Sequence, residues 1–297
     1  MKKVLVIGST VADIIIRLNK LPTTGGDVNV RGQKMSLGGC AFNVSQAIDY
    51  FGVPYVLYSP DGTGIYADYI RNELKKLNVN RAELNADEPN GCCYCLVEDD
   101  GERTFICDHG AEYRYKPEWY EGLNSDEFSC AYICGLEIEE NTGDIVIDFL
   151  ERSGIPFYFA PGPRINEIQK DKMERIFSLR PILHVNATEA MSFSGAKTLK
   201  EAAERLMTKT NNSVIITNGD KGSCCLCFED KIWYEEPAFK AEVVDTIGAG
   251  DSHIGAYIAQ RELGKSISES LREANRISSL VVQTEGARIN KLLSYLK

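Results

Sequence analysis

The most informative stretch of this chain is Val243-Val244-Asp245-Thr246-Ile247-Gly248-Ala249-Gly250-Asp251-Ser252-His253-Ile254-Gly255-Ala256. It begins as a short apolar strand, passes through small residues to a carboxylate, and continues as a helix. The small side chains at 248–250 let backbone N–H groups at the helix N-terminus face an anion, because unpaired donors and the helix macrodipole favour negative charge there. The stretch therefore predicts an anion-binding turn with Asp251 beside the anion. We also expect this helix N-terminus to lower the pKa of Asp251.

The composition is that of an ordinary globular protein with one large domain, or with one domain and a small appendage. The chain has 297 residues, of which 43% are hydrophobic and 26% are charged. The 43 acidic and 33 basic residues give a net charge of -10, and there is no basic run that could neutralise a row of phosphates. We therefore expect neither nucleic acid nor an anionic membrane as a partner.

The N-terminal segment is predicted to be a strand, a turn and a second strand. Asp13 interrupts the apolar stretch that starts at Val4, and no small-residue cleavage site follows, so a signal peptide is disfavoured. No run of about 18 apolar residues exists to span a membrane. Ten cysteines in a chain of this length are too few for a disulfide scaffold. These observations predict a cytoplasmic protein with reduced thiols.

Two Cys-Cys-x-Cys clusters, at 92–95 and 224–227, raise the possibility of a zinc site. Both clusters lie in strand-like runs, where residues i and i+3 point to opposite faces and cannot share one metal ion. We interpret these cysteines as small apolar core residues.

Strand-like apolar runs alternate with amphipathic helical stretches along most of the chain. Strands are predicted at Val4–Ile7, Val56–Tyr58, Ala131–Cys134, Phe157–Phe159, Ile182–Val185 and Val214–Thr217, and helices at Ala41–Phe51, Ile65–Leu77 and Ile145–Arg152. Capping-box patterns at Thr198–Glu201 and Ser266–Glu269 predict two more helix starts. This alternation predicts a doubly wound α/β fold, with a mainly parallel sheet and helices on both faces.

Two segments, 12–36 and 90–108, break this rhythm and are predicted to form a small second sheet, with a hairpin turn at Asp100-Gly101. Both faces of Gly91–Val97 are apolar. An exposed ribbon would not tolerate this, so each face should be covered. We expect a second copy of the chain to cover one of them.

The motif Asp245-Thr246-x-Gly248-Ala249-Gly250-Asp251, together with Gly38-Gly39-Cys40-Ala41-Phe42-Asn43, resembles the PfkB/ribokinase family of carbohydrate and nucleoside kinases. The order and spacing of motifs match over essentially the whole chain. The resemblance implies a single ribokinase-like domain over residues 1–297 and a β-sheet lid formed by 12–36 and 90–108. It also implies ATP- and Mg²⁺-dependent phosphoryl transfer to a hydroxyl group.

In this family Asp251 would take the proton of the acceptor hydroxyl, while the amides of Gly248, Ala249 and Gly250 form the anion hole for the γ-phosphoryl group. The alternative for Asp251 is a helix-terminal Asp that only complements the dipole. On the acceptor side, Asp13 lies in a strand of apolar residues, where an unpaired carboxylate is costly unless it meets donors. Candidate acceptor-binding residues that resemble the family pattern are Asp13, Gly38, Gly39, Asn43, Glu137 and Arg164.

Arg164 would lie near the transferring phosphate, although a surface arginine is equally compatible with its sequence. The family has an acidic residue where this chain has Ala160. Asp27, in the lid, is a weaker acceptor candidate and fits a solvated charge better. His253 is interpreted as a packing residue of its helix, with a contact to the substrate as the alternative. His109 and His184 belong to no motif.

Asn186 and Glu189 fit a helix cap, and the resemblance also implies a Mg²⁺ site at these two residues, contacted through water. Candidate nucleotide-binding residues are Asn186, Thr217, Gly219, Gly222 and Asn275. The 217–222 segment alone would fit a hairpin, and Asn275 would fit a solvated helix position. In related kinases the positions of Asp245, Ile247 and Gly286 can hold a monovalent cation, so potassium is a further expected cofactor.

The acceptor is expected to be a small sugar or sugar derivative without a phosphate, because the acceptor half lacks a cluster of Arg and Lys. A nucleoside kinase of the same family is the alternative. An NAD-dependent dehydrogenase is a weaker alternative, since Gly8–Asp13 lacks the later glycines of a dinucleotide-binding turn. A non-catalytic nucleotide- or sugar-sensing module is disfavoured because Asp251, Asn186 and Glu189 are all present.

Overall fold

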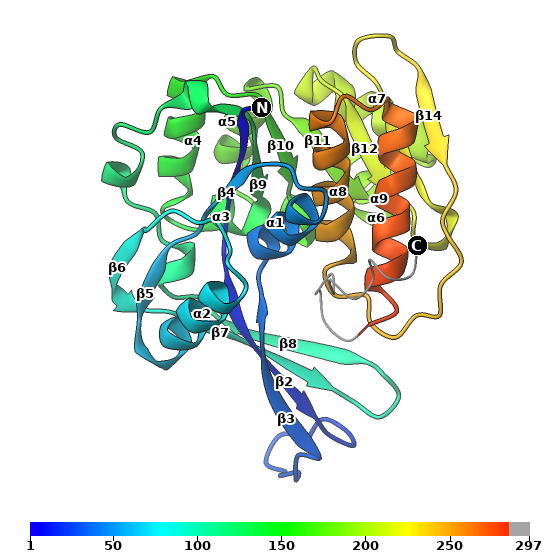
Figure 1. Cartoon of the computed structure of the whole chain (residues 1–297). Coiled ribbons are helices and arrows are strands. Elements are labelled where there is room, and N and C mark those ends of the chain that lie inside the picture. Colours follow the sequence, from blue (N-terminus) through cyan, green and yellow to red (C-terminus); the bar gives the residue numbers. More distant parts are fainter. Residues whose placement is uncertain (285–297) are drawn as a thin grey trace.

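A central sheet of eight strands, in the order β14-β13-β12-β11-β10-β9-β1-β4, organises the computed structural model (Figure 1). The structure describes residues 1–284. Six neighbouring strands are parallel, namely β4 (Tyr55–Tyr58), β1 (Lys3–Ile7), β9 (Phe128–Cys134), β10 (Phe157–Ala160), β11 (Ile182–Asn186) and β12 (Val214–Thr217). The antiparallel strands β13 (Ser223–Leu226) and β14 (Trp233–Glu236) complete one edge. The predicted fold class, a mainly parallel sheet, is confirmed.

Strand β1 shows why helices cover both faces of this sheet. Its side chains alternate, with Leu5 and Ile7 in one apolar cluster and Val4 and Val6 in the other, and all four are fully buried. Helices α4 (Gly143–Ser153), α5 (Lys170–Ser178), α6 (Ala187–Ser194) and α7 (Leu199–Thr210) supply the first cluster, and α1 (Cys40–Tyr50), α2 (Gly64–Lys76), α8 (Ala249–Glu262) and α9 (Ile267–Val281) supply the second.

The cysteines of the second cluster, at 224–227, lie in the core, which confirms their interpretation as apolar core residues. Cys224 belongs to the first apolar cluster and Cys225 to the second, so consecutive side chains point to opposite faces of β13. Cys227 is also buried.

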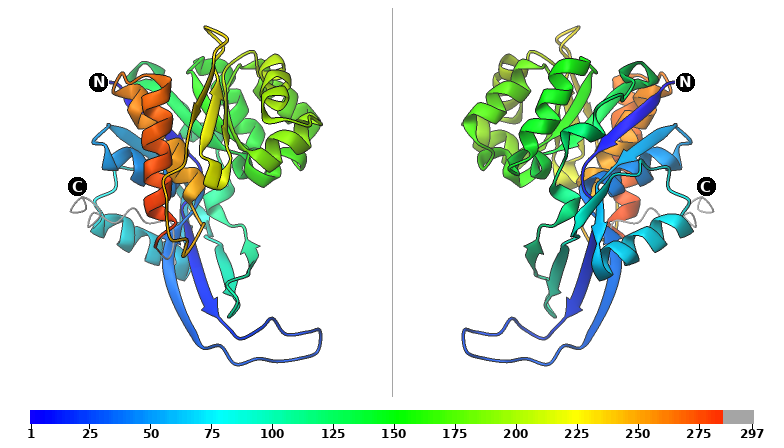
Figure 2. Two further views of the ribbon diagram at one scale, coloured as in Figure 1. Left: turned by 90° about the vertical axis from the view of Figure 1, so that its right-hand side faces the viewer. Right: turned by 90° about the vertical axis from the view of Figure 1, so that its left-hand side faces the viewer.

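The small second sheet contains four strands in the order β3-β2-β7-β8. They are β2 (Val11–Arg17), β3 (Gly32–Gly38), β7 (Cys92–Val97) and β8 (Arg103–Asp108), and Gly101 in the predicted hairpin turn has a φ of 89°. Figure 2 shows β2 and β3 extending away from the central sheet, with their connection reaching further out to one side. Sequence segments far apart in the chain are thereby joined into one sheet beside the ends of the parallel strands.

Several short elements had no clear signal in the sequence. Strands β5 (Asp61–Thr63) and β6 (Asn85–Pro89) form a two-stranded sheet, and α3 (Gly135–Glu139) is a single short helix after β9. The 3₁₀ turns are Ala111–Tyr113, Pro117–Trp119, Ser125–Glu127, Gly162–Asn166 and Gly219–Lys221. Each is too short to show a helical or strand period.

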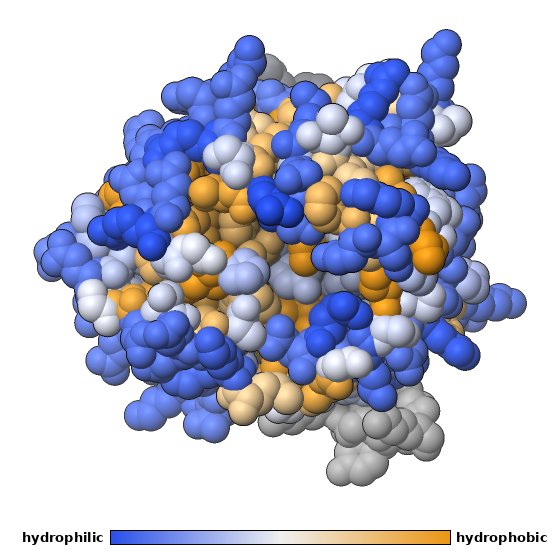
Figure 3. Space-filling model, turned by 90° about the horizontal axis from the view of Figure 1, so that it is seen from above, coloured by the Kyte–Doolittle hydropathy of each residue, from blue (hydrophilic) through white to orange (hydrophobic). Residues whose placement is uncertain are grey.

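The end of the molecule opposite the small sheet carries mostly polar and charged side chains, with smaller apolar areas between them (Figure 3). Such a mixed surface is usual for globular proteins. None of the helices within residues 1–284 is long and apolar enough to cross a membrane.

Candidate active site

The carboxyl ends of the parallel strands define where a ligand can bind. In the sheet β4 lies on one side of β1 and β9 lies on the other, and β4 comes before β9 in the chain. The direction in which the chain adds strands to the sheet therefore reverses between β1 and β9. In open α/β sheets such a reversal opens a crevice beyond the strand ends. Ser9 follows β1 and Glu137 follows β9, and the Ser9 amide donates to Glu137 Oε1 at 2.8 Å. The two segments therefore meet at this crevice.

Helix α8 begins with a bare N-terminus. Its N-cap is Gly248, with a φ of 71°, which offers no side chain to accept from the first amides. A Cβ atom placed on Gly250 would meet no heavy atom of residues 1–284 within 4 Å, so these residues leave the space beside it open. The Ala249 amide donates to the Thr246 carbonyl at 3.2 Å, and the other amides of such an open helix N-terminus fit a phosphate group.

Asp251 lies in the first turn of α8 and is half-buried. Asn43 on α1 donates from Nδ2 to Asp251 Oδ2 at 2.9 Å, although the two residues are 208 positions apart. Burial raises the pKa of Asp251 to about 6, against the lowering effect of hydrogen bonds from Asn43 and Cys40. The expectation that the helix N-terminus lowers this pKa is wrong, because desolvation of the carboxylate outweighs the favourable dipole.

Asp13 faces the same region from β2. A Cβ atom on Gly38 would lie 1.9 Å from Asp13 Oδ2, so only glycine allows the carboxylate to occupy its position. Gly39, with a φ of 96°, lets the chain pass close to the Ser9 carbonyl before α1 begins. Burial raises the pKa of Asp13 to about 7, and the charges of Cys107 and Asp251 add to the effect.

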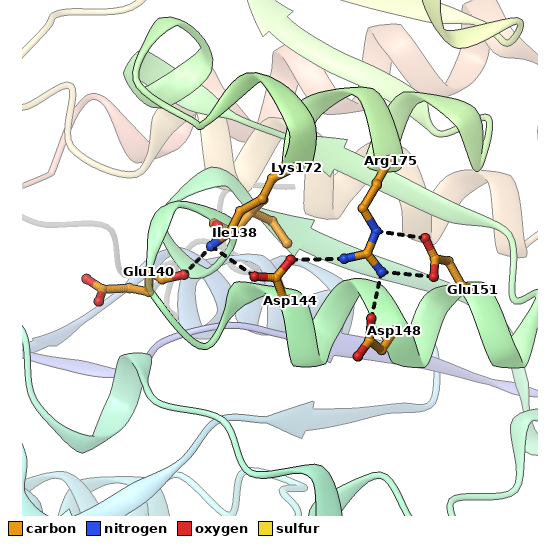
Figure 4. Close-up of polar contacts among 7 residues, drawn as sticks. All are labelled: Ile138, Glu140, Asp144, Asp148, Glu151, Lys172 and Arg175. Carbon is orange, nitrogen blue, oxygen red and sulfur yellow. Dashed lines mark hydrogen bonds and ion pairs between the residues drawn. The ribbon is translucent and has the colours of Figure 1, made fainter.

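Glu137 is fully buried at the start of α3, and its Oε2 atom has no hydrogen-bond partner among the described residues. Burial raises its pKa. The short helix is fixed from behind by Lys172, which donates from Nζ to the carbonyls of Ile138 and Glu140 at 3.1 and 2.6 Å (Figure 4). A buried oxygen without a partner, on a firmly held element, is suited to accept from a ligand hydroxyl.

The same close-up shows how α5 is attached to α4. Arg175 contacts Asp144, Asp148 and Glu151, with distances of 2.9, 2.6 and 2.9 Å from its two Nη atoms (Figure 4). One guanidinium shared by three carboxylates orders these helices more firmly than an isolated surface pair would.

Arg164 lies in the 3₁₀ turn after β10 and pairs with Glu139 at 3.2 Å. Its charge is close enough to the small sheet to help lower the pKa of Cys107. Arg164 thus lies on the side of the molecule that carries the small sheet. Asp27, by contrast, is exposed in the connection between β2 and β3.

Asn186 and Glu189 form the complete capping box of α6. The Glu189 amide donates to Asn186 Oδ1 and the Asn186 amide donates to Glu189 Oε2, both at 2.9 Å. Asn186 is exposed and Glu189 is half-buried at the end of β11. Their oxygen atoms are hard ligands that fit a water-mediated Mg²⁺ contact.

The predicted hairpin after β12 is present, with Gly219 and Gly222 at φ values of 57° and 100°. A Cβ atom on Gly222 would lie 2.1 Å from the Glu236 carbonyl, so this glycine is required for β14 to pack closely. No heavy atom of the described part of the chain lies within 4 Å of a Cβ atom on Gly219. Gly219 therefore lies on the more open side of the turn.

Asn275 is buried, so its interpretation as a solvated helix residue is wrong. Its Nδ2 donates to the carbonyls of Glu236 and Pro237, and its Oδ1 lies 3.2 Å from His253 Nε2. His253 Nδ1 in turn lies 3.1 Å from His184 Nε2. This buried chain links β11, α8, α9 and β14, and it engages both ends of the Asn275 amide within the protein.

Asp245 precedes the turn at Gly248–Gly250 and contacts the small sheet. Arg103 on β8 donates to Asp245 Oδ1 at 2.6 Å, and the Ile247 amide donates to the same atom at 2.8 Å. A guanidinium at this carboxylate does not fit a monovalent cation at the same oxygen. Gly286, the third residue expected for that cation, lies outside the described residues.

Sequence reasoning missed several residues at this crevice. Cys40 contributes a hydrogen bond to Asp251, Arg103 pairs with Asp245, and His109 lies 2.6 Å from Glu140. Arg103 and His109 belong to no motif, and Cys40 lies within the Gly38–Asn43 motif without any signal for a contact with Asp251. The contact of Cys40 depends on how α1 packs against α8, and the contacts of Arg103 and His109 depend on where β8 lies.

A model of the pfkB family carbohydrate kinases matches residues 1–292 of this chain. The chain belongs to this family. An Escherichia coli K12 member described as an uncharacterized sugar kinase, YegV, is 30% identical, with 96% of this chain and 90% of the relative aligned. A nucleoside kinase of Thermoplasma acidophilum is 27% identical over 83% of this chain and 78% of its own length.

The fold of this pfkB family member is also that of a ribokinase. The structure of Arabidopsis thaliana ribokinase complexed with ribose and ATP superimposes with a TM-score of 0.77 at 20% identity, covering 96% of this chain and 94% of that one. As a carbohydrate kinase of the family, the protein is a phosphotransferase with an alcohol group as acceptor.

The dehydrogenase alternative is wrong, since the chain is a kinase. The fold gives the physical reason. In a dinucleotide-binding unit a helix follows the first strand, and its N-terminus binds the pyrophosphate. Here β1 is followed in the chain by strand β2 and not by a helix.

Proposed function

We propose that this protein transfers the γ-phosphoryl group of ATP to a hydroxyl of a small, unphosphorylated sugar or sugar derivative. The observation that carries the proposal is the hydrogen bond from Asn43 to Asp251, directly beside the uncapped N-terminus of α8. It sets a carboxylate with an oriented oxygen next to an anion-binding turn. Phosphoryl transfer needs both in one place, because catalysis rests on positioning and on charge stabilisation.

The base in this mechanism is Asp251. Its Oδ2 atom is held by Asn43, which leaves Oδ1 to accept the proton of the acceptor hydroxyl as that oxygen attacks phosphorus. With a pKa of about 6, the carboxylate is mostly ionised at neutral pH and is a stronger base than an exposed Asp. The amides of Gly248 and Gly250 stabilise the negative charge on the phosphoryl oxygens, whereas the Ala249 amide is engaged by the Thr246 carbonyl.

The acceptor site offers mainly hydrogen-bond acceptors. Asn43 Oδ1 and Glu137 Oε2 are buried without partners among the described residues, and Asp13 adds a third oxygen group. Hydroxyl groups are the donors that such oxygens require. The nearby cations are already paired, Arg164 with Glu139 and His109 with Glu140, which argues against an acceptor that carries its own phosphate.

ATP fits the bare helix terminus and the open turn at Thr217 and Gly219. Asn186 and Glu189 would hold Mg²⁺ through its water ligands, and the ion would neutralise charge on the nucleotide phosphates.

Two of the candidate nucleotide-binding residues have structural roles instead. Gly222 allows β14 to pack closely, and the internal hydrogen bonds of Asn275 favour a supporting role over a direct contact with adenine. The Asp245–Arg103 pair disfavours potassium activation, which replacement of K⁺ by a bulky organic cation would test.

A nucleoside is the second candidate acceptor, because the Thermoplasma acidophilum relative is a nucleoside kinase. The ribose of a nucleoside would present vicinal hydroxyls to Asp13 and Asn43, as a free sugar would.

The decisive experiment measures ADP release with a panel of pentoses, hexoses, sugar acids and nucleosides, at saturating MgATP. Thermal shifts with the same panel and a non-hydrolysable ATP analogue would report binding without turnover. The proposal predicts ADP release that depends on one or more unphosphorylated sugars. Turnover only with nucleosides would replace the acceptor assignment, and no turnover with any hydroxyl compound would contradict the proposal as a whole.

We further propose that the small sheet is a lid over the acceptor site and that two copies of the chain associate through it. A row of apolar side chains crosses its other face, and the end residues of this row, Met35 and Ile106, are exposed at 39% and 56%. Apolar faces of this kind favour association. Ten free cysteines agree with action in a reducing compartment such as the cytoplasm.

A further inference from the structure

Asp13, Cys93 and Cys107 lie in one row across the small sheet. Asp13 on β2 is paired with Cys93 on β7, and Cys93 is paired with Cys107 on β8. Directly paired residues of adjacent strands point to the same face of a sheet. The two thiols therefore share the face of Asp13, and their sulfur atoms are 3.5 Å apart.

The two cysteines differ in accessibility and in charge. Cys107 is exposed and Cys93 is half-buried. Hydrogen bonds from Cys93 and His109 lower the pKa of Cys107 to about 5, whereas the pKa of Cys93 is raised. The hydrogen bond to Cys107 is the main cause that raises the pKa of His109 to about 9, although burial opposes this shift. Glu140, which lies 2.6 Å from His109 Nδ1, raises this pKa further. At neutral pH this is a thiolate–imidazolium pair with a second thiol in contact.

We propose that Cys93 and Cys107 form a site of reversible thiol oxidation, which reacts with low-molecular-weight disulfides and closes to an intrachain disulfide beside Asp13.

The reaction is a pair of thiol–disulfide exchanges. The Cys107 thiolate attacks one sulfur of a disulfide RSSR, forms a mixed disulfide and releases RS⁻, which takes up a proton. Cys93 then loses its proton and attacks the Cys107 sulfur, and the second RS⁻ leaves and is protonated. In sum, two protein thiols and RSSR give one protein disulfide and two RSH. The protein is oxidised by two electrons, and the small disulfide is reduced.

The backbone geometry permits this bond without breaking the strand pairing. Directly opposite residues in an antiparallel pair have Cα atoms about 4.5–5.5 Å apart. Disulfides span about 4.4–6.8 Å between Cα atoms, with an S–S bond of about 2.05 Å. The sulfurs must therefore approach by about 1.5 Å, a movement that side-chain rotation and a small shift of β8 can supply.

The other described cysteines lack this combination. Cys95 is on the same face of β7, but the residue opposite it on β8 is Phe105. Cys40 and Cys134 interact with each other, but Cys134 is buried and the pKa of each thiol is raised. Reactivity with a bulky disulfide should therefore be confined to Cys107 as the attacking group.

Oxidation should also affect the acceptor site, an effect that rests on the proposed kinase function. The disulfide removes the Cys107 charge that contributes to the raised pKa of Asp13, and it draws β7 and β8 together in the row of Asp13. Displacements of this size next to a binding group can reduce kcat/KM for the acceptor by about tenfold or more. Binding of nucleotide, at the other side of the crevice, should not change.

The test treats the reduced full-length protein with glutathione disulfide at neutral pH and follows it by intact-mass and peptide mass spectrometry. The expected product has lost about 2 Da, one hydrogen from each thiol, and yields a peptide cross-linked between positions 93 and 107. Dithiothreitol should reverse the change. Cys93→Ser should stop at a stable mixed disulfide on Cys107, Cys107→Ser should yield neither product, and the matched control Cys95→Ser should close as the wild type does.

These readouts need no turnover, so they stay valid if the kinase proposal fails. Absence of the 93–107 cross-link, or equal modification of Cys107 and the buried cysteines, would overturn the site. A complete disulfide that leaves the acceptor kcat/KM unchanged would refute its coupling to the acceptor site.

Discussion

The hydrogen bond between Asn43 and Asp251 gives the sharpest prediction, because its loss should move a pH profile in a known direction. The bond is 2.9 Å long and favours the ionised carboxylate. Hydrogen bonds to charged groups contribute about 1.5–3 kcal/mol, and one pKa unit corresponds to about 1.36 kcal/mol. The variant Asn43→Ala should therefore raise the pKa of Asp251 by about one unit from its value of about 6.

The direction in which the pH profile should shift follows from the role of Asp251 as the base. Asp251 acts only when ionised, so the acceptor kcat/KM is lost as the pH falls through its pKa. In Asn43→Ala the acidic limb should start about one unit higher than in the wild type, and the plateau should also fall because Asn43 Oδ1 no longer accepts from the acceptor. The assay is acceptor kcat/KM from pH 5 to 9, at saturating MgATP.

Two controls make this result interpretable. Ser45 is buried on the same helix and its hydroxyl donates to the Phe42 carbonyl, so Ser45→Ala should leave the limb in place. Asp13 titrates in the same range and is coupled to Asp251, so the comparison is repeated in an Asp13→Asn background. A folded Asn43→Ala protein with an unmoved acidic limb in both backgrounds would refute the assignment of that limb to Asp251.

Three other predictions concern stability and assembly. Because the folded-state pKa of Asp13 is raised from 3.8 to about 7, stability is lost as the pH rises through this interval. Thermal unfolding of Asp13→Asn should accordingly show a gain of about 1–2 kcal/mol at pH 8 and none near pH 4, and an equal gain at both values would contradict this. Arg103→Met leaves the buried Asp245 carboxylate without its guanidinium and should cost about 2 kcal/mol in denaturant unfolding, with partial recovery in Arg103→Lys. Light scattering at micromolar concentration should give a dimer for the wild type and a monomer for Ile106→Lys, and a monomeric wild type would remove the proposed interface.

Local patterns were sufficient to predict most of the fold. The alternation of apolar runs and amphipathic stretches predicted the parallel strands, and the two irregular segments matched the four strands of the second sheet. The caps at Asn186 and Ser266 are complete capping boxes. These features depend on residues within a few positions of each other, where sequence spacing and three-dimensional distance are tightly related.

The chemistry of the site depended on contacts that no local pattern contains. Asn43 was predicted to bind the acceptor, but its bond to Asp251 requires α1 and α8 to pack side by side. The direction of the Asp251 pKa shift was wrong because the helix dipole can be inferred from sequence, whereas burial cannot. The row of Asp13, Cys93 and Cys107 depends on strand register, which shifts every side chain to the other face if it slips by one residue.

The central claim is that Asp251 is the base of a phosphoryl transfer whose anion is bound by the adjoining helix terminus. Asp251→Asn keeps the size of the side chain and its position beside Asn43 but cannot accept the proton. Single-turnover transfer to the best acceptor, measured alongside ATP-analogue binding, should fall at least about a hundredfold while the analogue binds as before. Transfer at the wild-type rate by the folded variant would contradict the account.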